Sequence, residues 1–242
     1  MADEVKKVPT GIEGLDHILQ GGIPEGSTVL VSGACGTGKT TLGMEFLFRG
    51  GDGKGSGVFI AVTESPDKVI ENMSGYEFFE KDRLGKSVTL IDVNDLYAEI
   101  KFEGEEQVSR NDVERLVEAF LRKTKDADRV VIDSITGICF HLEKKELIRF
   151  FILSLSNALR ERKTTAILTS EIPPDSAHYS LYGVEDAVAD GVIMLGNVEE
   201  RGHLLRTLHV VKMRGTVHSR AKYVMDLTPY GIILVPLLKP HR

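Results

Sequence analysis

The sequence predicts an α/β fold with a mostly parallel, doubly wound sheet and a C-terminal antiparallel extension. Apolar runs alternate with segments of helical periodicity over most of the chain. Several of these runs are apolar throughout, as expected for parallel strands covered on both faces. Near the C-terminus the pattern changes to successive strand-like runs joined by short turns, which favours antiparallel pairing.

The predicted elements follow one another in the order that right-handed β-α-β crossovers require. The predicted parallel strands are 28–32, 57–62, 88–92, 129–133, 165–169 and 192–195. The predicted helices are 39–49, 67–72, 111–125 and 144–162. The predicted antiparallel strands are 204–213, 221–226 and 232–235, and the polar segment 96–106 is predicted to be an exposed loop.

Composition indicates one large domain and excludes several classes of protein. The 242 residues carry a net charge of −6, so no global charge attracts the chain to nucleic acid or to an anionic membrane. Cys35 and Cys139 are too few for a disulfide framework, and no apolar run has the length of a membrane span. We expect a single cytoplasmic domain over 1–242, with a flexible segment 1–9 and a short tail 236–242.

Residues 33–40 read GACGTGKT and match the phosphate-binding pattern G-x-x-x-x-G-K-[ST] at every fixed position. A predicted strand precedes the match and a predicted helix follows it, which is the setting that the motif requires. The glycines let consecutive N–H groups face phosphate oxygens, and the lysine reaches the β- and γ-phosphates. The predicted ligand is ATP with Mg²⁺, and the predicted nucleotide-binding residues are Gly33, Ala34, Cys35, Gly36, Thr37, Gly38, Lys39, Thr40 and Thr41.

Two oxygen-bearing side chains are the predicted magnesium ligands. The Thr40 hydroxyl ends the phosphate-binding pattern, and Asp133 ends the apolar run RVVID. A strand of this kind delivers its terminal carboxylate to the carboxyl edge of the sheet, beside the phosphate loop. We therefore predict that Asp133 holds Mg²⁺ directly or through water.

Glu64 is the candidate catalytic base. It follows the predicted strand 57–62, which should lie near the strand that bears the phosphate loop. From that place it can polarise a water that faces the γ-phosphate. The alternative is a glutamate ahead of a helix that begins near Pro66, and the residues alone favour neither role.

Further motifs indicate a family. The sequence resembles the KaiC-like branch of the RecA superfamily, of the archaeal type, over almost its full length. Besides the phosphate loop, the matching residues are 10–16 (TGIEGLD), 21–24 (GGIP), 64–66 (ESP), 133–134 (DS), 182–185 (YGVE), 189–193 (ADGVI) and 211–218 (VKMRGTVH). The resemblance implies a RecA-like fold and ATP as the nucleotide.

The resemblance also implies ATP hydrolysis at subunit interfaces of a homo-oligomeric ring, commonly a hexamer. In such a ring Lys212, Arg214 and His218 reach the neighbour's nucleotide, with Met213 and Thr216 in the same stretch. Lys212 and Arg214 are then catalytic, since a cation in trans stabilises charge on the transferred phosphoryl group. Without the resemblance, Lys212 and Arg214 would be interpreted as a solvated basic hairpin.

Two positions depart from the pattern of related ATPases. Thr63-Glu64 stands where members of the resembled family often carry two adjacent glutamates. Glu64 acts alone as the base, or the chain is a slow ATPase that works as a nucleotide-gated switch. Glu171 stands where recombinases usually place a glutamine, and an ionised glutamate cannot donate a hydrogen bond to phosphate.

Three functions remain open: an ATPase ring that acts on itself or on a protein partner, a recombinase-like protein that binds single-stranded DNA, and a nucleotide-gated scaffold. The DNA hypothesis is the weakest, because 171–186 contains no lysine or arginine. Phosphate-tracking grooves need basic residues. Tyr179 and Tyr182 could stack on bases, but the acidic residues Glu171, Asp175, Glu185 and Asp186 oppose DNA binding.

Overall fold

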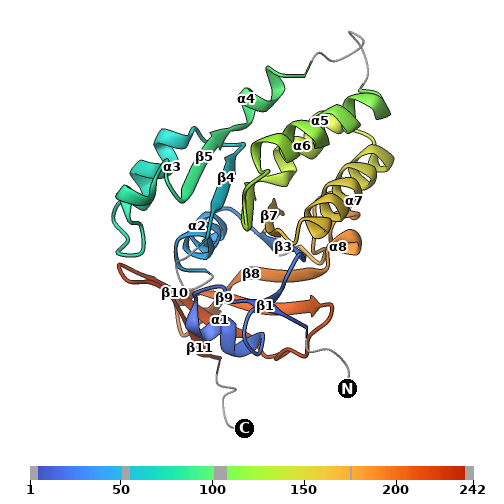
Figure 1. The fold of residues 1–242 in the computed structure, drawn as a ribbon. Coiled ribbons are helices and arrows are strands. Elements are labelled where there is room, and N and C mark those ends of the chain that lie inside the picture. The colour runs from blue at the N-terminus through green and yellow to red at the C-terminus, as the bar shows by residue number, and fades with distance from the viewer. Residues whose placement is uncertain (1–4, 51–54, 101–107, 175, 238–242) are drawn as a thin grey trace.

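The structure is a computed structural model that describes residues 5–50, 55–100, 108–174 and 176–237. Most of its strands form one large twisted sheet, with helices on both sides (Figure 1). The strands of this sheet are β3 (Thr28–Gly33), β4 (Gly57–Ala61), β5 (Val88–Asp92), β6 (Arg129–Asp133), β7 (Thr165–Glu171), β8 (Gly191–Glu200), β9 (His203–Met213), β10 (Tyr223–Thr228) and β11 (Gly231–Pro236). A separate ribbon pairs β1 (Lys7–Val8) with β2 (Ile23–Pro24).

The order of the nine-stranded sheet is β11-β10-β9-β8-β3-β7-β6-β4-β5. Pairing is parallel from β8 to β5 and antiparallel from β8 to β11. The predicted fold class, a mostly parallel sheet with a C-terminal antiparallel extension, is confirmed. The phosphate-loop strand β3 lies between β7 and β8, inside the parallel part.

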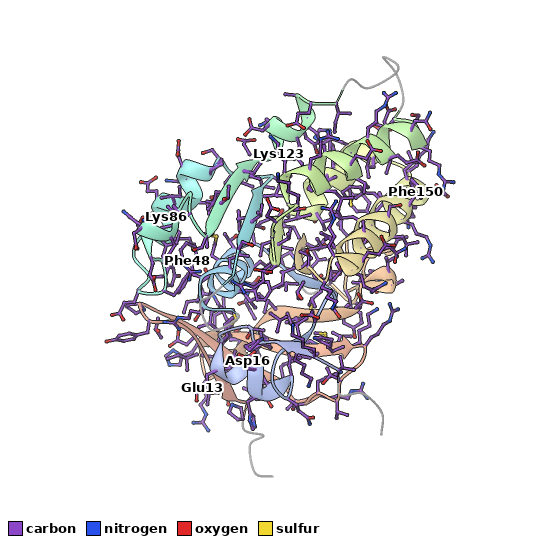
Figure 2. The ribbon with its side chains drawn as sticks, in the orientation of Figure 1. Glu13, Asp16, Phe48, Lys86, Lys123 and Phe150 are labelled. Atoms are coloured by element: carbon purple, nitrogen blue, oxygen red, sulfur yellow. The ribbon has the colours of Figure 1, made fainter. Side chains whose placement is uncertain are left out.

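Helices cover both faces of the sheet. The described α-helices are α1 (Glu13–Ile18), α2 (Lys39–Arg49), α3 (Pro66–Met73), α4 (Val93–Tyr97), α5 (Arg110–Lys123), α6 (Ile135–Leu142), α7 (Lys145–Glu161) and α8 (Glu185–Val188), with a 3₁₀ turn η2 at Lys81–Arg83. Glu13 and Asp16 of α1 lie at the end of the molecule formed by the antiparallel strands, and Lys123 and Phe150 lie far from them (Figure 2).

Two apolar clusters follow from the alternation of side chains along each strand. On β3, Val29 and Val31 face the cluster beneath α1, α2 and α3, while Leu30 faces the cluster beneath α4 to α8. On β6, Val131 faces the first cluster and Ile132 the second. Burial on both faces explains why these strands are apolar throughout and confirms the doubly wound arrangement.

The prediction of an exposed loop over 96–106 is wrong at Leu96, Tyr97 and Ile100, whereas Ala98 and Glu99 lie in an exposed turn. Leu96 belongs to α4 and is fully buried, and Ile100 is also buried. The Asp92 side chain accepts a hydrogen bond from the Asn94 N–H at 2.8 Å and caps this short helix. The polar residues 101–107 dominated the prediction, and they lie outside the described residues.

The predicted flexible segment 1–9 is corrected at its C-terminal end, because Lys7–Val8 form β1 and pair with Pro24 and Ile23. Pro236, the first residue of the predicted tail, ends β11, and the Leu237 N–H donates to the Lys222 carbonyl at 3.1 Å. Residues 1–4 and 238–242 lie outside the described residues. Across the described part of the chain, none of the helices is both long and apolar enough to cross a membrane.

Candidate nucleotide site

A cavity of about 380 Å³ opens at the carboxyl end of the parallel strands, beside the loop that joins β3 to α2. This is the edge at which doubly wound sheets bind ligands. The cavity is lined by Cys35, Gly36, Gly38, Lys39, Thr40, Thr41, Ala61, Thr63, Glu64, Val69, Asp133, Glu171 and Leu227. The loop, both predicted magnesium ligands and the candidate base therefore meet in one place.

Glycines shape the loop. Gly38 has φ +97° and immediately precedes α2, and Gly36 has φ +76° with no heavy atom within 4 Å of the place of a β-carbon. The Thr37 hydroxyl closes the loop by donating to the Ala34 carbonyl at 2.8 Å. The N-terminus of α2 thus points its unpaired N–H groups into the cavity, which suits an anion.

Gly38→Ala is expected to lower the free energy of unfolding by about 1–3 kcal/mol. The left-handed backbone at Gly38 strains any side chain, and a β-carbon there would lie 2.9 Å from the Met225 methyl group. Gly75→Ala is the control, because its β-carbon would meet nothing within 4 Å. Urea unfolding followed by circular dichroism measures both variants, since the chain has no tryptophan. Equal stability of the two variants would contradict this account.

Lys39 is buried, and its ammonium group donates to the carbonyls of Gly33 at 2.9 Å and Ala34 at 3.0 Å. Burial lowers the pKa of Lys39, and the nearby Glu171 and Asp133 carboxylates oppose that shift. The amine is therefore held at the loop.

The Thr40 hydroxyl donates to the Asp133 carboxylate at 2.6 Å, and the second carboxylate oxygen accepts from the Thr169 hydroxyl. Hydroxyl and carboxylate oxygens suit Mg²⁺, which prefers few protein ligands and completes its shell with phosphates and water. Among the described residues, no group of three histidine, cysteine or acidic side chains could hold a metal ion. The Thr40 hydroxyl and the Asp133 carboxylate are a pair of oxygen donors that fits magnesium.

Glu64 lines the cavity although two strands, β7 and β6, lie between β4 and β3 in the sheet. The prediction that these two strands lie near each other is therefore wrong. Glu64 instead reaches the cavity from the loop that follows β4. The Asn72 amide donates to its carboxylate at 3.1 Å. Ser65, the next residue, accepts from the Lys68 N–H at 3.4 Å and caps α3, so capping does not require Glu64.

Sequence reasoning missed three apolar residues of the cavity: Ala61, Val69 and Leu227. Leu227 is separated from the loop by about three quarters of the chain, and no motif marks it. Arg206 was also missed. It comes from β9, and its guanidinium donates to the Gly36 carbonyl at 3.1 Å.

Residues 212–218 lie at the amino end of the parallel strands, opposite to the end that carries the cavity. Met213 pairs with Gly191, which pairs with Val29 near the start of β3. The Arg214 N–H donates to the Asp190 carbonyl, and the Asp190 N–H to the Thr28 carbonyl. The distance along β3 from Thr28 to the loop is about 16 Å, at roughly 3.3 Å per residue. Of the described residues that line the cavity, none comes from 212–218.

Arg214, Thr216 and His218 of this segment have polar contacts within their own chain. Arg214 donates to the carbonyls of Ala187 at 3.2 Å and Val188 at 3.3 Å, and lies 3.5 Å from the Asp190 carboxylate. The Thr216 hydroxyl accepts from the Lys7 amine at 2.6 Å. Burial and the nearby Arg214 lower the pKa of Lys212. His218 Nδ1 lies 3.1 Å from the Ser219 carbonyl.

A family model described as "ATPase: KaiC" matches residues 8–239, nearly the whole chain. The chain belongs to the KaiC family of ATPases. A KaiC-like protein of the archaeon Pyrococcus horikoshii OT3 has a similar solved structure, with a TM-score of 0.77 and 34% identity. That match covers 96% of this chain and 100% of the archaeal one.

Curated relatives within the KaiC family are circadian clock oscillator proteins. KaiC of Prochlorococcus marinus is 36% identical over 241 residues, which are 97% of this chain and 46% of the relative. KaiC 1 of a Synechocystis species is 36% identical over 237 residues, 96% of this chain and 45% of the relative. The chain thus spans about half the length of the curated relatives it matches.

The sequence predicts that the acidic segment 171–186 of this KaiC-family domain disfavours DNA binding. In the structure the acidic residues of this segment differ in exposure. Glu185 is fully buried, and its carboxylate accepts from the N–H groups of Tyr182 at 3.2 Å and Val184 at 3.1 Å. The Asp186 carboxylate accepts from the Ser180 hydroxyl. Glu185 therefore organises the segment rather than charging its surface, and Asp175 lies outside the described residues.

Proposed function

We propose that this KaiC-family chain hydrolyses ATP to ADP and phosphate within a homo-oligomeric ring, with each site shared between neighbouring subunits. In this proposal residues 1–242 act as one ATPase domain, the ring is a cytoplasmic hexamer, and its cycle acts on the ring or on a protein partner. The glycine-rich loop, Lys39 and the N-terminus of α2 hold the phosphates.

The side chains of the cavity then have distinct tasks. Thr40 and Asp133 would hold Mg²⁺, which when bound offsets charge on the β- and γ-phosphates. Glu64 orients a water and accepts its proton as the water oxygen attacks the γ-phosphorus and the bond to the β-phosphate oxygen breaks. Arg214 and Lys212 of the neighbour supply positive charge to the phosphoryl group in transfer, while Met213, Thr216 and His218 complete the shared surface.

The proposal of a site shared between subunits is supported by the distance between the cavity and residues 212–218 of the same chain. A chain that holds these groups about 16 Å along β3 from its own loop cannot apply them to its own nucleotide. In a ring of identical subunits packed head to tail, the two ends of neighbouring sheets can meet. Ring assembly therefore offers one place where both halves act on the same phosphates.

The test is ATP turnover per chain measured against protein concentration, with Lys39→Ala as the blank. Turnover per chain is expected to rise steeply with concentration, since a lone subunit lacks the cations supplied in trans. Turnover that is measurable but independent of concentration, with monomers in solution, would contradict the shared site. Turnover equal to the Lys39→Ala blank while ATP still binds would instead support the nucleotide-gated scaffold.

A further inference from the structure

Glu45 is a buried acid on the phosphate-binding helix α2 that the proposed chemistry does not use. Its side chain is fully buried. One carboxylate oxygen accepts from the Arg49 guanidinium at 2.8 Å, and the other accepts from the Ile232 N–H of β11 at 2.8 Å. The burial raises the pKa of Glu45, which reflects the cost of a charge in this place.

Arg49, one helical turn further along α2, continues the same contact. Its guanidinium also donates to the Tyr230 carbonyl at 2.6 Å, in the turn between β10 and β11. Gly231, the first residue of β11, has φ +124°, and a β-carbon there would lie 2.4 Å from the Glu45 carboxylate. The turn is therefore shaped to admit this carboxylate, and Glu45 and Arg49 together clamp the hairpin onto α2.

The clamped hairpin forms a wall of the nucleotide cavity. Leu227 of β10 lines the cavity, and its cross-strand partner in β11 is Ile232, the residue whose N–H donates to Glu45. A β-carbon added at Gly38 would lie 3.4 Å from the Leu227 side chain. In Figure 1, α2 lies between β4 and the strands β10 and β11. Glu45 thus holds Ile232, the residue of β11 that pairs with the cavity-lining Leu227.

Hydrophobic contact alone would not require a charged pair here. Only the Glu45 end of this ion pair is buried, because 39% of the Arg49 side chain is exposed. Burying a charged group costs free energy that an apolar residue of similar volume would not cost, but the hydrogen bonds of the pair fix one geometry. Apolar side chains at these positions would let the hairpin slide along α2, whereas Glu45 and Arg49 join it at two backbone atoms, the Ile232 nitrogen and the Tyr230 oxygen. The pair therefore specifies where the hairpin sits relative to the phosphate loop.

We propose that Glu45 and Arg49 are positioning residues for nucleotide binding: they hold the β10–β11 hairpin on α2 and so set Leu227 as the wall against which the bound nucleotide packs. This inference rests on the proposed nucleotide-binding function and deepens it. The pair touches no nucleotide, and its effect reaches the site through Leu227.

Equilibrium titration with a fluorescent ATP analogue tests the proposal without depending on hydrolysis. In Glu45→Gln the amide oxygen can still accept from the Ile232 N–H, but its NH₂ group cannot accept from Arg49. The Kd is expected to rise about 10-fold in Glu45→Gln and in Leu227→Ala, as for loss of a few apolar contacts. Where turnover is measured, KM should rise and kcat at saturation should stay within about twofold.

The double variant separates positioning from a general loss of stability. If Glu45 acts through Leu227, Glu45→Gln should add little to the Kd of Leu227→Ala. Glu114→Gln is the matched control, because Glu114 also pairs with an arginine four residues away, Arg110 at 3.6 Å, but is exposed on α5. Its Kd should equal that of the unmodified chain.

Arg49→Lys covers the case in which Glu45→Gln does not fold. Lysine keeps the charge beside Glu45 but lacks the fork that also reaches Tyr230, so the Kd should rise here too. Unchanged ATP binding in folded Glu45→Gln or Arg49→Lys, with only a lower melting temperature, would overturn the proposal. If the unmodified chain itself binds no ATP, the proposed function fails instead.

Discussion

Arg214→Ala is expected to lower ATP turnover by about three orders of magnitude or more and to leave ATP binding nearly unchanged. A guanidinium supplied in trans matters most in the transition state, where charge on the transferred phosphoryl group is redistributed. Single-turnover kinetics and nucleotide titration measure the two quantities separately. If Arg214→Ala weakened ATP binding by the same factor as it lowered kcat/KM, Arg214 would stabilise bound ATP and the transition state equally.

Arg160→Ala is the control that separates this role from the contact of Arg214 with Asp190. Arg160 makes two hydrogen bonds to the Asp190 carboxylate, at 2.8 and 2.9 Å, closer than the 3.5 Å of Arg214. If support of Asp190 were the task, Arg160→Ala should be the more damaging change. We expect it to retain most turnover.

Mixing Arg214→Ala with Lys39→Ala gives the sharper result. Each variant alone is expected to be inactive, but in mixed rings an intact loop of one chain can meet an intact Arg214 of its neighbour. Turnover should therefore reappear on mixing and depend on the ratio of the two chains. No recovery, in rings shown to be mixed, would exclude a site shared in this way.

Glu64→Gln is expected to lower kcat by about 10²- to 10⁴-fold, the range for removal of a general base. The glutamine keeps the size of the side chain and can still accept from Asn72, which donates to Glu64 at 3.1 Å. ATP binding should be retained, because the lost interaction develops only as the water gives up its proton. Presteady-state phosphate release measures the step.

Glu171→Gln is the comparison for Glu64→Gln, because Glu171 is a second carboxylate that lines the same cavity from the end of β7. We expect a much smaller effect on kcat from this change. If both variants hydrolyse ATP as slowly as the unmodified chain, Thr63-Glu64 is an inactive pair, and the nucleotide-gated switch becomes the better description.

Local patterns were enough to predict the loop and the elements that flank it. The predicted helix 39–49 agrees with α2, and the predicted strand 28–32 is one residue shorter than β3. Consecutive N–H groups of one short segment form the phosphate cradle, so its residues lie together wherever the chain folds. Short helices such as α1 and α6 were missed, because so few residues show little periodicity.

The sequence by itself determined the fold class, the phosphate loop and the residues that deserve testing, because each rests on contiguous residues or on a family motif. Only the tertiary structure decided that Leu227 faces the cavity, that Glu45 and Arg49 clamp its hairpin, and that residues 212–218 lie at the far end of β3. These facts depend on strand order. Buried parallel strands look alike in sequence, and an apolar run does not encode which strand will lie beside it.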